Sequence, residues 1–118
     1  MTDLDLRMVI LSTDDLDGSI AFYTETLGMP LKFRDGDRFA AIDAGSVSLA
    51  LATAIDHPAP GRTVVGVKAD DVDGAARAVE LGGGMIVRPP YDDAHERRAV
   101  VRDNMGNDLV IYGALRKR

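Results

Sequence analysis

Few side chains in this sequence are suited to catalysis or metal binding. The chain has no cysteine, which excludes disulfides, thiolate nucleophiles and Cys-bound zinc. The two histidines, His57 and His95, are interpreted as solvated loop residues. The alternative is that His95-Glu96, with Asp92 and Asp93 close by, binds a metal weakly or supplies an acid and a base on a lid.

Four further side chains have the chemistry of a general acid or base: Asp43, Lys68, Asp108 and Tyr112. Each one stands at the end of a predicted strand, where polar residues are common, and Lys side chains often extend to solvent there. The structural interpretation is therefore favoured. A metal-free lyase, isomerase or cyclase would need at least one of them in its site.

Composition limits the classes of function. The 118 residues correspond to one domain, and the apolar content of 46% is enough for a core. Fourteen basic and nineteen acidic residues give a net charge of −5, which argues against nucleic-acid binding. The excess acid also indicates that Arg97, Arg98 and Arg102 serve first as ion-pair partners. No apolar run reaches the roughly 20 residues of a membrane span and no signal peptide is visible, so we expect a soluble cytoplasmic protein.

The stretch Met8–Met29 organises the chain. Its pattern predicts a strand, an N-cap at Asp14 or Asp15, a helix over 16–27 and a stop at Gly28. Phe22 and Tyr23 on this helix are predicted core residues. One helical face carries the apolar residues Leu16, Ile20, Tyr23 and Leu27.

The same pattern occurs a second time, in Val64–Met85. A shift of 56 positions places Asp14-Asp15 on Asp70-Asp71 and Gly28-Met29 on Gly84-Met85. We interpret this as an internal duplication. It divides the single domain, 1–118, into a module over 6–52, a linker over 53–62 and a module over 63–112.

Each module is predicted to have the order β-α-β-β-β, which makes the fold class α+β. Two such modules would pair into a curved mixed sheet, with helices on the convex faces and a cavity between the concave ones. Residues 89–96 are predicted to be a polar loop and 113–118 a frayed basic tail. The predicted strands are 7–12, 29–34, 38–43, 47–52, 63–68, 85–88, 97–102 and 108–112, and the second helix is 72–81.

Two segments carry a resemblance to a known family. The first runs from Asp15-Leu16-Asp17 through Ala21-Phe22-Tyr23 to Leu27-Gly28-Met29, and the second is the turn Asp103–Asn107 before the last strand. The chain resembles the vicinal oxygen chelate superfamily, which includes glyoxalase I, extradiol dioxygenases and the fosfomycin- and bleomycin-resistance proteins. This resemblance implies paired βαβββ modules and a homodimer.

The resemblance also implies where a metal ion would bind. Metal-using members place His or Glu at four inward positions, which match Met8, Ala50, Val64 and Val110 in this sequence. None of these side chains offers the nitrogen or oxygen that a hard or borderline divalent ion needs. We therefore expect neither a metal nor another cofactor.

The favoured function is metal-independent binding and sequestration of a small molecule, such as a natural product or antibiotic, as in the bleomycin-resistance branch. The metal-free lyase, isomerase or cyclase is the main alternative, followed by a metal-dependent glyoxalase or dioxygenase. No nucleic-acid or membrane partner is expected. The predicted ligand contacts are Met8, Ile10, Phe39, Ser48, Ala50, Val64, Gly66, Tyr91, Arg98, Val100, Asp108, Val110 and Tyr112.

Overall fold

The computed structural model describes residues 3–115, which form eight strands and two α-helices. Strand pairing is both parallel and antiparallel, so the predicted α+β class is confirmed. The chain divides into two compact units. We call Arg7–Val64 the N-terminal unit, and residues 65–115 together with 3–6 the C-terminal unit. The last three residues of the predicted basic tail lie outside the described part, in which no helix is long and apolar enough to cross a membrane.

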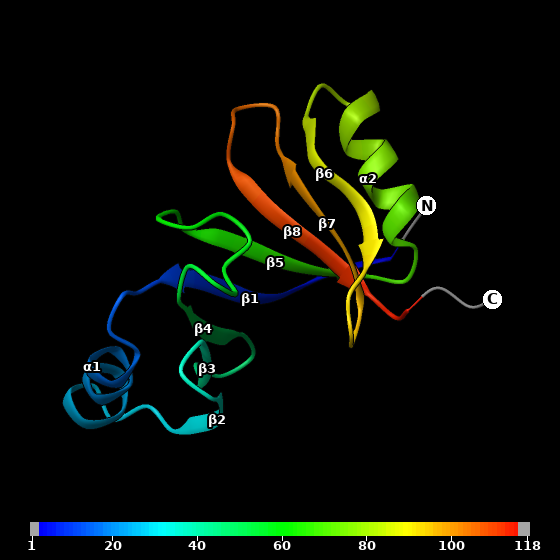
Figure 1. Ribbon diagram of the computed structural model, residues 1–118. Coiled ribbons are helices and arrows are strands. Elements are labelled where there is room, and N and C mark those ends of the chain that lie inside the picture. The colour runs from blue at the N-terminus through cyan, green and yellow to red at the C-terminus, as the bar shows by residue number, and fades with distance from the viewer. Residues whose placement is uncertain (1–2, 116–118) are drawn as a thin grey trace. The chain divides into compact units, whose positions relative to one another are not determined.

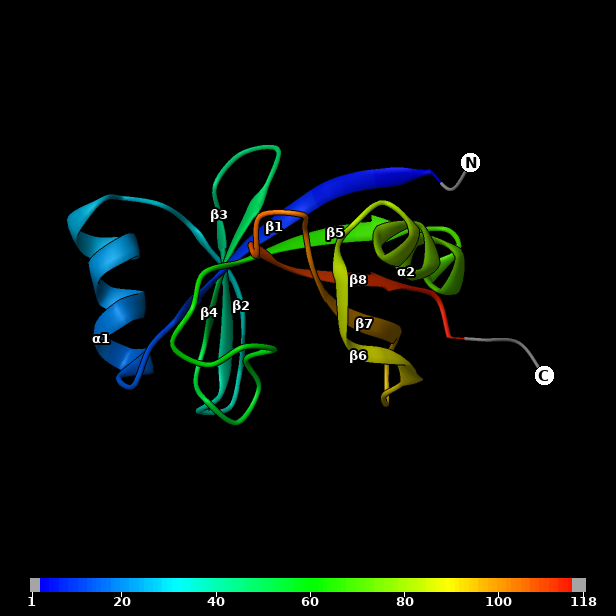
Figure 2. The ribbon, with the colours of Figure 1, turned by 90° about the horizontal axis from the view of Figure 1, so that it is seen from above.

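The strands of the N-terminal unit follow the order β2-β3-β4-β1, in which β1 runs parallel to β4 and the other neighbours are antiparallel. Helix α1 contacts β3 and β4 (Figure 2). The buried core of this unit consists of Leu16, Ala40, Ile42 and Leu51. The elements are β1 (Leu4–Ser12), α1 (Leu16–Ala21), the π-helical turn η1 (Phe22–Thr26), β2 (Leu31–Asp35), β3 (Phe39–Asp43) and β4 (Ser48–Ala52).

In the C-terminal unit the order is β6-β7-β8-β5, in which β5 runs parallel to β8 and the other neighbours are antiparallel. Helix α2 contacts β6, β7 and β8 (Figure 1). Small residues, Ala75, Ala76 and Ala99, bring the helix close to the sheet, where Val101 and Ile111 complete the core. The elements are β5 (Val64–Ala69), α2 (Val72–Leu81), β6 (Met85–Asp92), β7 (Arg97–Arg102) and β8 (Asp108–Gly113).

Both helices begin at an aspartate, as the sequence predicts. Of the two residues considered for the first helix, Asp15 is the N-cap, and its Oδ1 accepts a hydrogen bond from Gly18 N at 3.0 Å. Asp71 Oδ1 accepts from Gly74 N at the same distance. A Cβ on Gly18 would lie 2.3 Å from Asp15 Oδ2, so the glycine of the repeated motif leaves room for the capping carboxylate.

The first helix differs from its prediction after Ala21. The backbone widens into a π-helical turn, in which Leu27 N donates to Phe22 O at 3.1 Å. The wider turn shifts the later residues around the axis. Tyr23 packs on the core as predicted, whereas Phe22 and Leu27 are about half exposed, so the core prediction is wrong for both. Gly28 has φ +75°, the left-handed conformation expected where the helical segment ends.

Three strands are longer than predicted, and β8 gains only Gly113. Strand β1 starts at Leu4, preceded by Asp3, whose N–H donates to Asp70 Oδ1 at 3.1 Å and whose carbonyl accepts from Asp70 N at 3.4 Å. Strand β6 continues to Asp92 through the predicted loop. Two prolines are tolerated in β6 because it lies at a sheet edge and need not donate on its free side.

His57 is not a solvated loop residue, contrary to prediction. It is 6% exposed, and its Nδ1 accepts a hydrogen bond from Ala59 N at 2.9 Å. The linker folds into tight turns, in which His57 N donates to Thr53 O at 2.9 Å and Arg62 N to Ala59 O at 3.1 Å. Ser12 Oγ holds the end of the linker, accepting from Gly61 N at 2.8 Å and donating to Arg62 O at 3.2 Å.

Candidate functional site

The predicted ligand contacts of the N-terminal unit share one face of its sheet. Cross-strand partners project to the same side, and the pairs are Met8 with Ser48 and Ile10 with Ala50. Ala50 also pairs with Ala41 on β3, and Phe39 with Ala52. The alternate residues Leu11, Leu49 and Leu51 pack in the core under α1. The face opposite α1 therefore carries the predicted contacts of this unit on its β1, β3 and β4 strands.

Two more side chains belong to this face, and sequence reasoning missed both. Lys32 Nζ donates to Ser48 Oγ at 2.8 Å. The ring of Phe33 stacks on that of Phe39, with centroids 5.8 Å apart and planes inclined by 28°. A register shift between Leu31 and Phe33 places them there. A β-bulge leaves no reliable signal in a single sequence, and strict alternation would have put these two neighbouring residues on opposite faces.

In the C-terminal unit, the remaining predicted contacts form rows across the sheet. Tyr91 pairs with Arg98, and Arg98 pairs with Tyr112. Gly66 pairs with Val110, and Val110 pairs with Val100. Leu109 and Ile111 alternate with these residues and pack under α2. The contacts therefore lie on the face opposite α2. On this face Tyr91 and Tyr112 are the neighbours of Arg98 on the two adjacent strands. Val64, the first residue of β5, is fully buried.

Arg98 is the best placed cation of this row. Its side chain is 18% exposed, and its two ion pairs are long, at 3.6 Å from Nη1 to Asp93 Oδ2 and 3.7 Å from Nε to Glu96 Oε2. The Nε atom has no hydrogen-bond partner. Tyr91 is the partner of Arg98 across β6 and β7. The guanidinium carbon of Arg88 lies 3.6 Å from the centroid of the Tyr91 ring, a cation–π contact.

Asp108 is a structural ion-pair partner in this structure. It is buried, and its Oδ1 accepts a hydrogen bond from Arg102 Nε at 3.0 Å across β7 and β8. This contact agrees with the interpretation of Arg102 as a partner for the excess acid. Because Arg102 already occupies this carboxylate, we interpret Asp108 as structural rather than catalytic.

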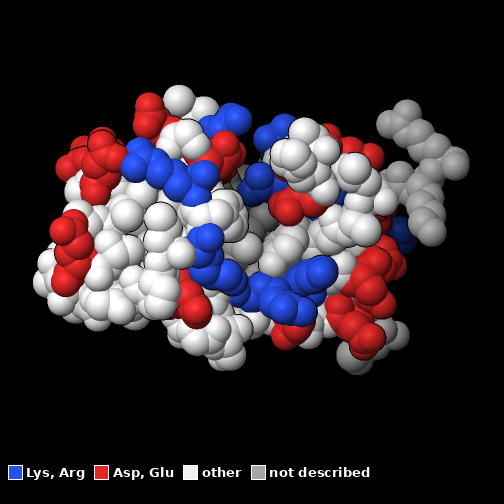
Figure 3. Space-filling model, turned by 90° about the horizontal axis from the view of Figure 1, so that it is seen from below, with Lys and Arg blue, Asp and Glu red and all other residues white. Residues whose placement is uncertain are grey.

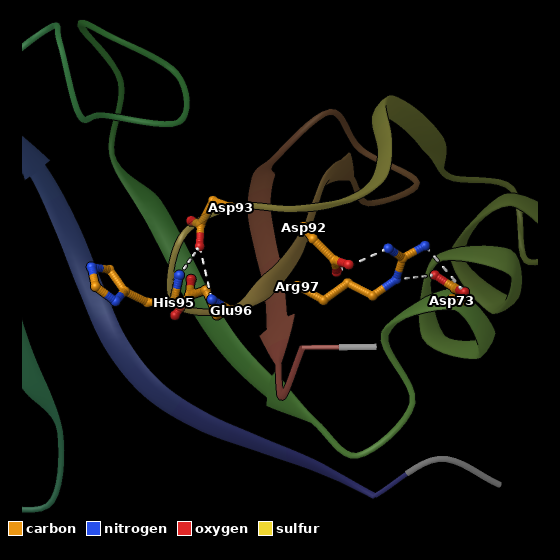
Figure 4. Close-up of polar contacts among 6 residues, drawn as sticks. All are labelled: Asp73, Asp92, Asp93, His95, Glu96 and Arg97. Carbon is orange, nitrogen blue, oxygen red and sulfur yellow. Dashed lines mark hydrogen bonds and ion pairs between the residues drawn. The ribbon is translucent and has the colours of Figure 1, made fainter. Parts of the chain in front are cut away.

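The β6–β7 turn does not form the metal site considered for His95-Glu96. Asp93 Oδ1 accepts from the backbone N–H groups of His95 and Glu96, both at 2.8 Å (Figure 4). Burial by itself would raise the pKa of Asp93, but these two bonds and the Arg98 charge hold it below its usual value. Figure 4 also shows the His95 ring pointing away from Asp92, whose carboxylate faces Arg97.

Arg97 connects the turn to α2. Its Nη1 lies 3.1 Å from Asp92 Oδ1, and its Nε donates to Asp73 Oδ1 at 2.9 Å (Figure 4). The hydrogen bond that Arg97 donates to Asp73 contributes most to raising the pKa of the guanidinium. Close by, a groove of about 590 Å³ opens between α2 and β6, with Asp71, Glu80 and Arg77 in its lining. Figure 3, which views the molecule from below, shows acidic and basic side chains beside one another on that face.

The four positions that hold metal ligands in metal-using relatives do not fit a metal here. Ala50, Val64 and Val110 are 1%, 0% and 2% exposed, and the fourth residue, Met8, offers only a soft thioether sulfur. Elsewhere among residues 3–115, no group of three or more His, Cys, Asp or Glu side chains is arranged to bind a metal ion.

The family assignment follows from comparison with known sequences. The pattern of the Glyoxalase/Bleomycin resistance protein/Dioxygenase superfamily matches residues 6–111. This chain belongs to that superfamily. An uncharacterised protein of Mycolicibacterium smegmatis is 62% identical over 117 residues, which cover 99% of this chain and 100% of that protein.

Solved structures of the same fold agree with this assignment. A superfamily member from Vibrio splendidus has a TM-score of 0.71 at 14% identity, covering 96% of this chain and 99% of that one. A protein described as an NAD-dependent benzaldehyde dehydrogenase from Legionella pneumophila reaches 0.77 at 18% identity, with coverage of 92% and 98%. At these identities the likeness concerns the superfamily fold alone.

Proposed function

We propose that this superfamily member binds and sequesters a small organic molecule without a metal ion. The observation that carries the proposal is the apolar character of Met8, Ala50, Val64 and Val110, the positions of metal ligands in metal-using relatives. The lack of nitrogen and oxygen donors at these positions favours an organic guest over a coordinated ion. Protection by such a protein would come from mass action, because the bound compound is kept from its target.

Polar groups beside the apolar positions would orient the guest. In the C-terminal unit these are Arg98 and Tyr112, which pair across β7 and β8. In the N-terminal unit Ser48 lies two residues before Ala50 on the same strand, so both side chains are on one face. An apolar surface with a few directed polar groups is the usual composition of a small-molecule site. The sequence has no tryptophan, so stacking must rely on Phe and Tyr, which is why we name no single drug.

Metal-free catalysis is the competing proposal, and the geometry supports it less. Asp108 is committed to Arg102, and the carboxylate of Asp43 accepts the Gly45 N–H at 2.9 Å. Lys68 and Tyr112 remain, and they are neighbours across β5 and β8. A Lys–Tyr pair of this kind can move protons, so product analysis has to accompany every binding assay.

The test combines metal analysis with a thermal-shift screen of natural-product antibiotics. We expect less than stoichiometric metal in the purified protein, and at least one compound that raises Tm by several degrees at saturation. Treatment with EDTA should leave that shift unchanged. The compound should be recovered intact after long incubation.

A pair of matched variants locates the binding. Arg98→Gln should reduce the ligand-induced shift, whereas Arg38→Gln, which removes an exposed guanidinium from the β2–β3 turn, should not. Stoichiometric zinc, iron or manganese in the protein would refute the proposal. So would conversion of the compound by EDTA-treated protein, which would establish the catalytic alternative.

A further inference from the structure

The face of the N-terminal unit opposite α1 has a cation at one end and an aromatic pair at the other. The β-bulge in β2 creates this arrangement. Leu31 pairs with Ile42 of the core, yet Phe33, two residues later, pairs with the adjacent Ala41. The register shift therefore places Lys32 and Phe33, which are adjacent in the sequence, on the same face. The Lys32 amine reaches Ser48, which lies on the same face as Ala50 and Ala41.

Lys32 keeps hydrogen-bonding capacity for a ligand. Within the described residues its ammonium group has one partner, Ser48 Oγ at 2.8 Å. Asp43 pairs with Ser48 in the sheet, but one of its carboxylate oxygens accepts the Gly45 N–H instead. A lysine ammonium has three N–H groups, so two remain available. The Ser48 contact also restricts the long side chain before a ligand arrives, which lowers the entropy cost of binding.

The aromatic end is equally accessible. Phe33 is 53% exposed although its ring stacks on Phe39. An exposed, nearly parallel ring pair offers a flat surface on which a further ring can stack. Between the two ends lie Ala41 and Ala50, which pair across β3 and β4 and are 4% and 1% exposed.

The spacing between the ends indicates the size of the ligand. Ser48 is two residues from Ala50, which lies in the row of Phe33, and four residues from Ala52, which lies in the row of Phe39. At about 3.4 Å per residue these separations along the strands are roughly 7 and 14 Å, and each strand crossed from β4 to β3 or β2 adds about 4.8 Å sideways. One or two fused rings with a carboxylate attached span such a distance.

We propose that Lys32 and Ser48 bind the anionic group of a planar aromatic ligand whose ring lies against Phe33 and Phe39. This inference rests on the proposed binding function and adds the chemical class of the ligand, an aromatic carboxylate. The overall charge of −5 would not suggest an anion, but the local charge at Lys32 favours one. A ligand amine at this position would be repelled.

Two probes of equal shape test the charge preference: 2-naphthoate and its neutral analogue 2-naphthamide. Calorimetric titration of the wild-type protein should give roughly tenfold tighter binding of the carboxylate, the size expected for one charge-assisted hydrogen-bonded pair. Lys32→Met should remove this difference, and Lys32→Arg should restore most of it. Phe33→Ala should weaken both probes. In amide NMR spectra, 2-naphthoate should shift resonances of β2, β3 and β4.

Arg38→Met is the matched control, because it removes one positive charge from the same unit at an exposed turn position. It should keep the preference for the carboxylate. All variants change exposed side chains, and unfolding curves will confirm that they fold. Equal affinity for the two probes, no binding of either, or a preference that survives Lys32→Met would overturn the inference. The proposed function fails separately, by bound metal or turnover in the screen described above.

Discussion

Arg97 on β7 donates hydrogen bonds to both carboxylate oxygens of Asp73 on α2, from Nε to Oδ1 at 2.9 Å and from Nη2 to Oδ2 at 3.3 Å. The equivalent aspartate of the first repeat, Asp17, pairs with Arg34 of β2 at 2.7 Å. In both units an acid of the repeated motif thus attaches the helix to a strand of the same unit. The two contacts differ in exposure, and their contributions to stability should differ accordingly.

Arg97→Met should lower the free energy of unfolding more than Arg34→Met does, because the Arg97 and Asp73 side chains are 15% and 38% exposed. Arg34→Met removes the more exposed pair, in which the side chains of Arg34 and Asp17 are 33% and 82% exposed. Urea denaturation followed by circular dichroism measures both values. Equal losses in the two variants would contradict this ranking.

The turn at Asp93 should make stability fall in acid. Because the pKa of Asp93 is lower in the folded protein than in the unfolded chain, its contribution is present above the unfolded value and is lost as the pH falls through the folded value. Because an unperturbed aspartate has a pKa of about 3.9, the loss of this stabilisation should begin below about pH 4. Asp93→Asn keeps an acceptor oxygen but cannot titrate.

Unfolding free energies between neutral and acid pH measure this difference. The wild-type curve should fall more steeply than that of Asp93→Asn at the acid end. Parallel curves would show that Asp93 does not contribute. The comparison is relative because Asp103, whose pKa is also lowered by hydrogen bonds from Asn107 and other turn groups, titrates in both proteins.

Gly18→Ala should have opposite effects in two backgrounds. In the wild-type protein the new Cβ meets Asp15 Oδ2, so the cap is displaced at a cost of about 1 kcal/mol. In Asp15→Ala the obstacle is absent, and alanine should stabilise the helix by up to about 1 kcal/mol relative to glycine. A double-mutant cycle measures the coupling, and additive effects would contradict the assigned role of Gly18.

The family resemblance predicts a homodimer, and analytical ultracentrifugation can test it. We expect a single species of twice the monomer mass of 12.6 kDa at micromolar concentration. A monomer that still binds its ligand would show that one chain holds a sufficient site.

Local chemistry made much of the fold predictable. An aspartate followed three residues later by glycine and then by an apolar face specifies where each helix starts, because the cap uses only neighbouring backbone N–H groups. Strand alternation also explains why Leu49 and Leu51 face α1 and why Leu109 and Ile111 face α2, since side chains of a strand alternate between faces.

Two departures involve partners that are distant in the sequence. The linker that contains His57 bonds to Ser12, and pairing with β7 extends β6 through two prolines. In both cases the folded backbone brings the partner into place. Periodicity arguments see only the adjacent residues. The π-helical turn is local, because its hydrogen bond joins Leu27 N to Phe22 O.

The candidate site divides in the same way. The sequence by itself determined the apolar character of Met8, Ala50, Val64 and Val110, because residue identity decides whether a side chain can ligate a metal. Tertiary structure alone decided that Lys32 and Phe33 join Ser48 and Phe39 on one face. A strand keeps its alternation until a bulge shifts the register, and the bulge exists only in the paired strands β2 and β3.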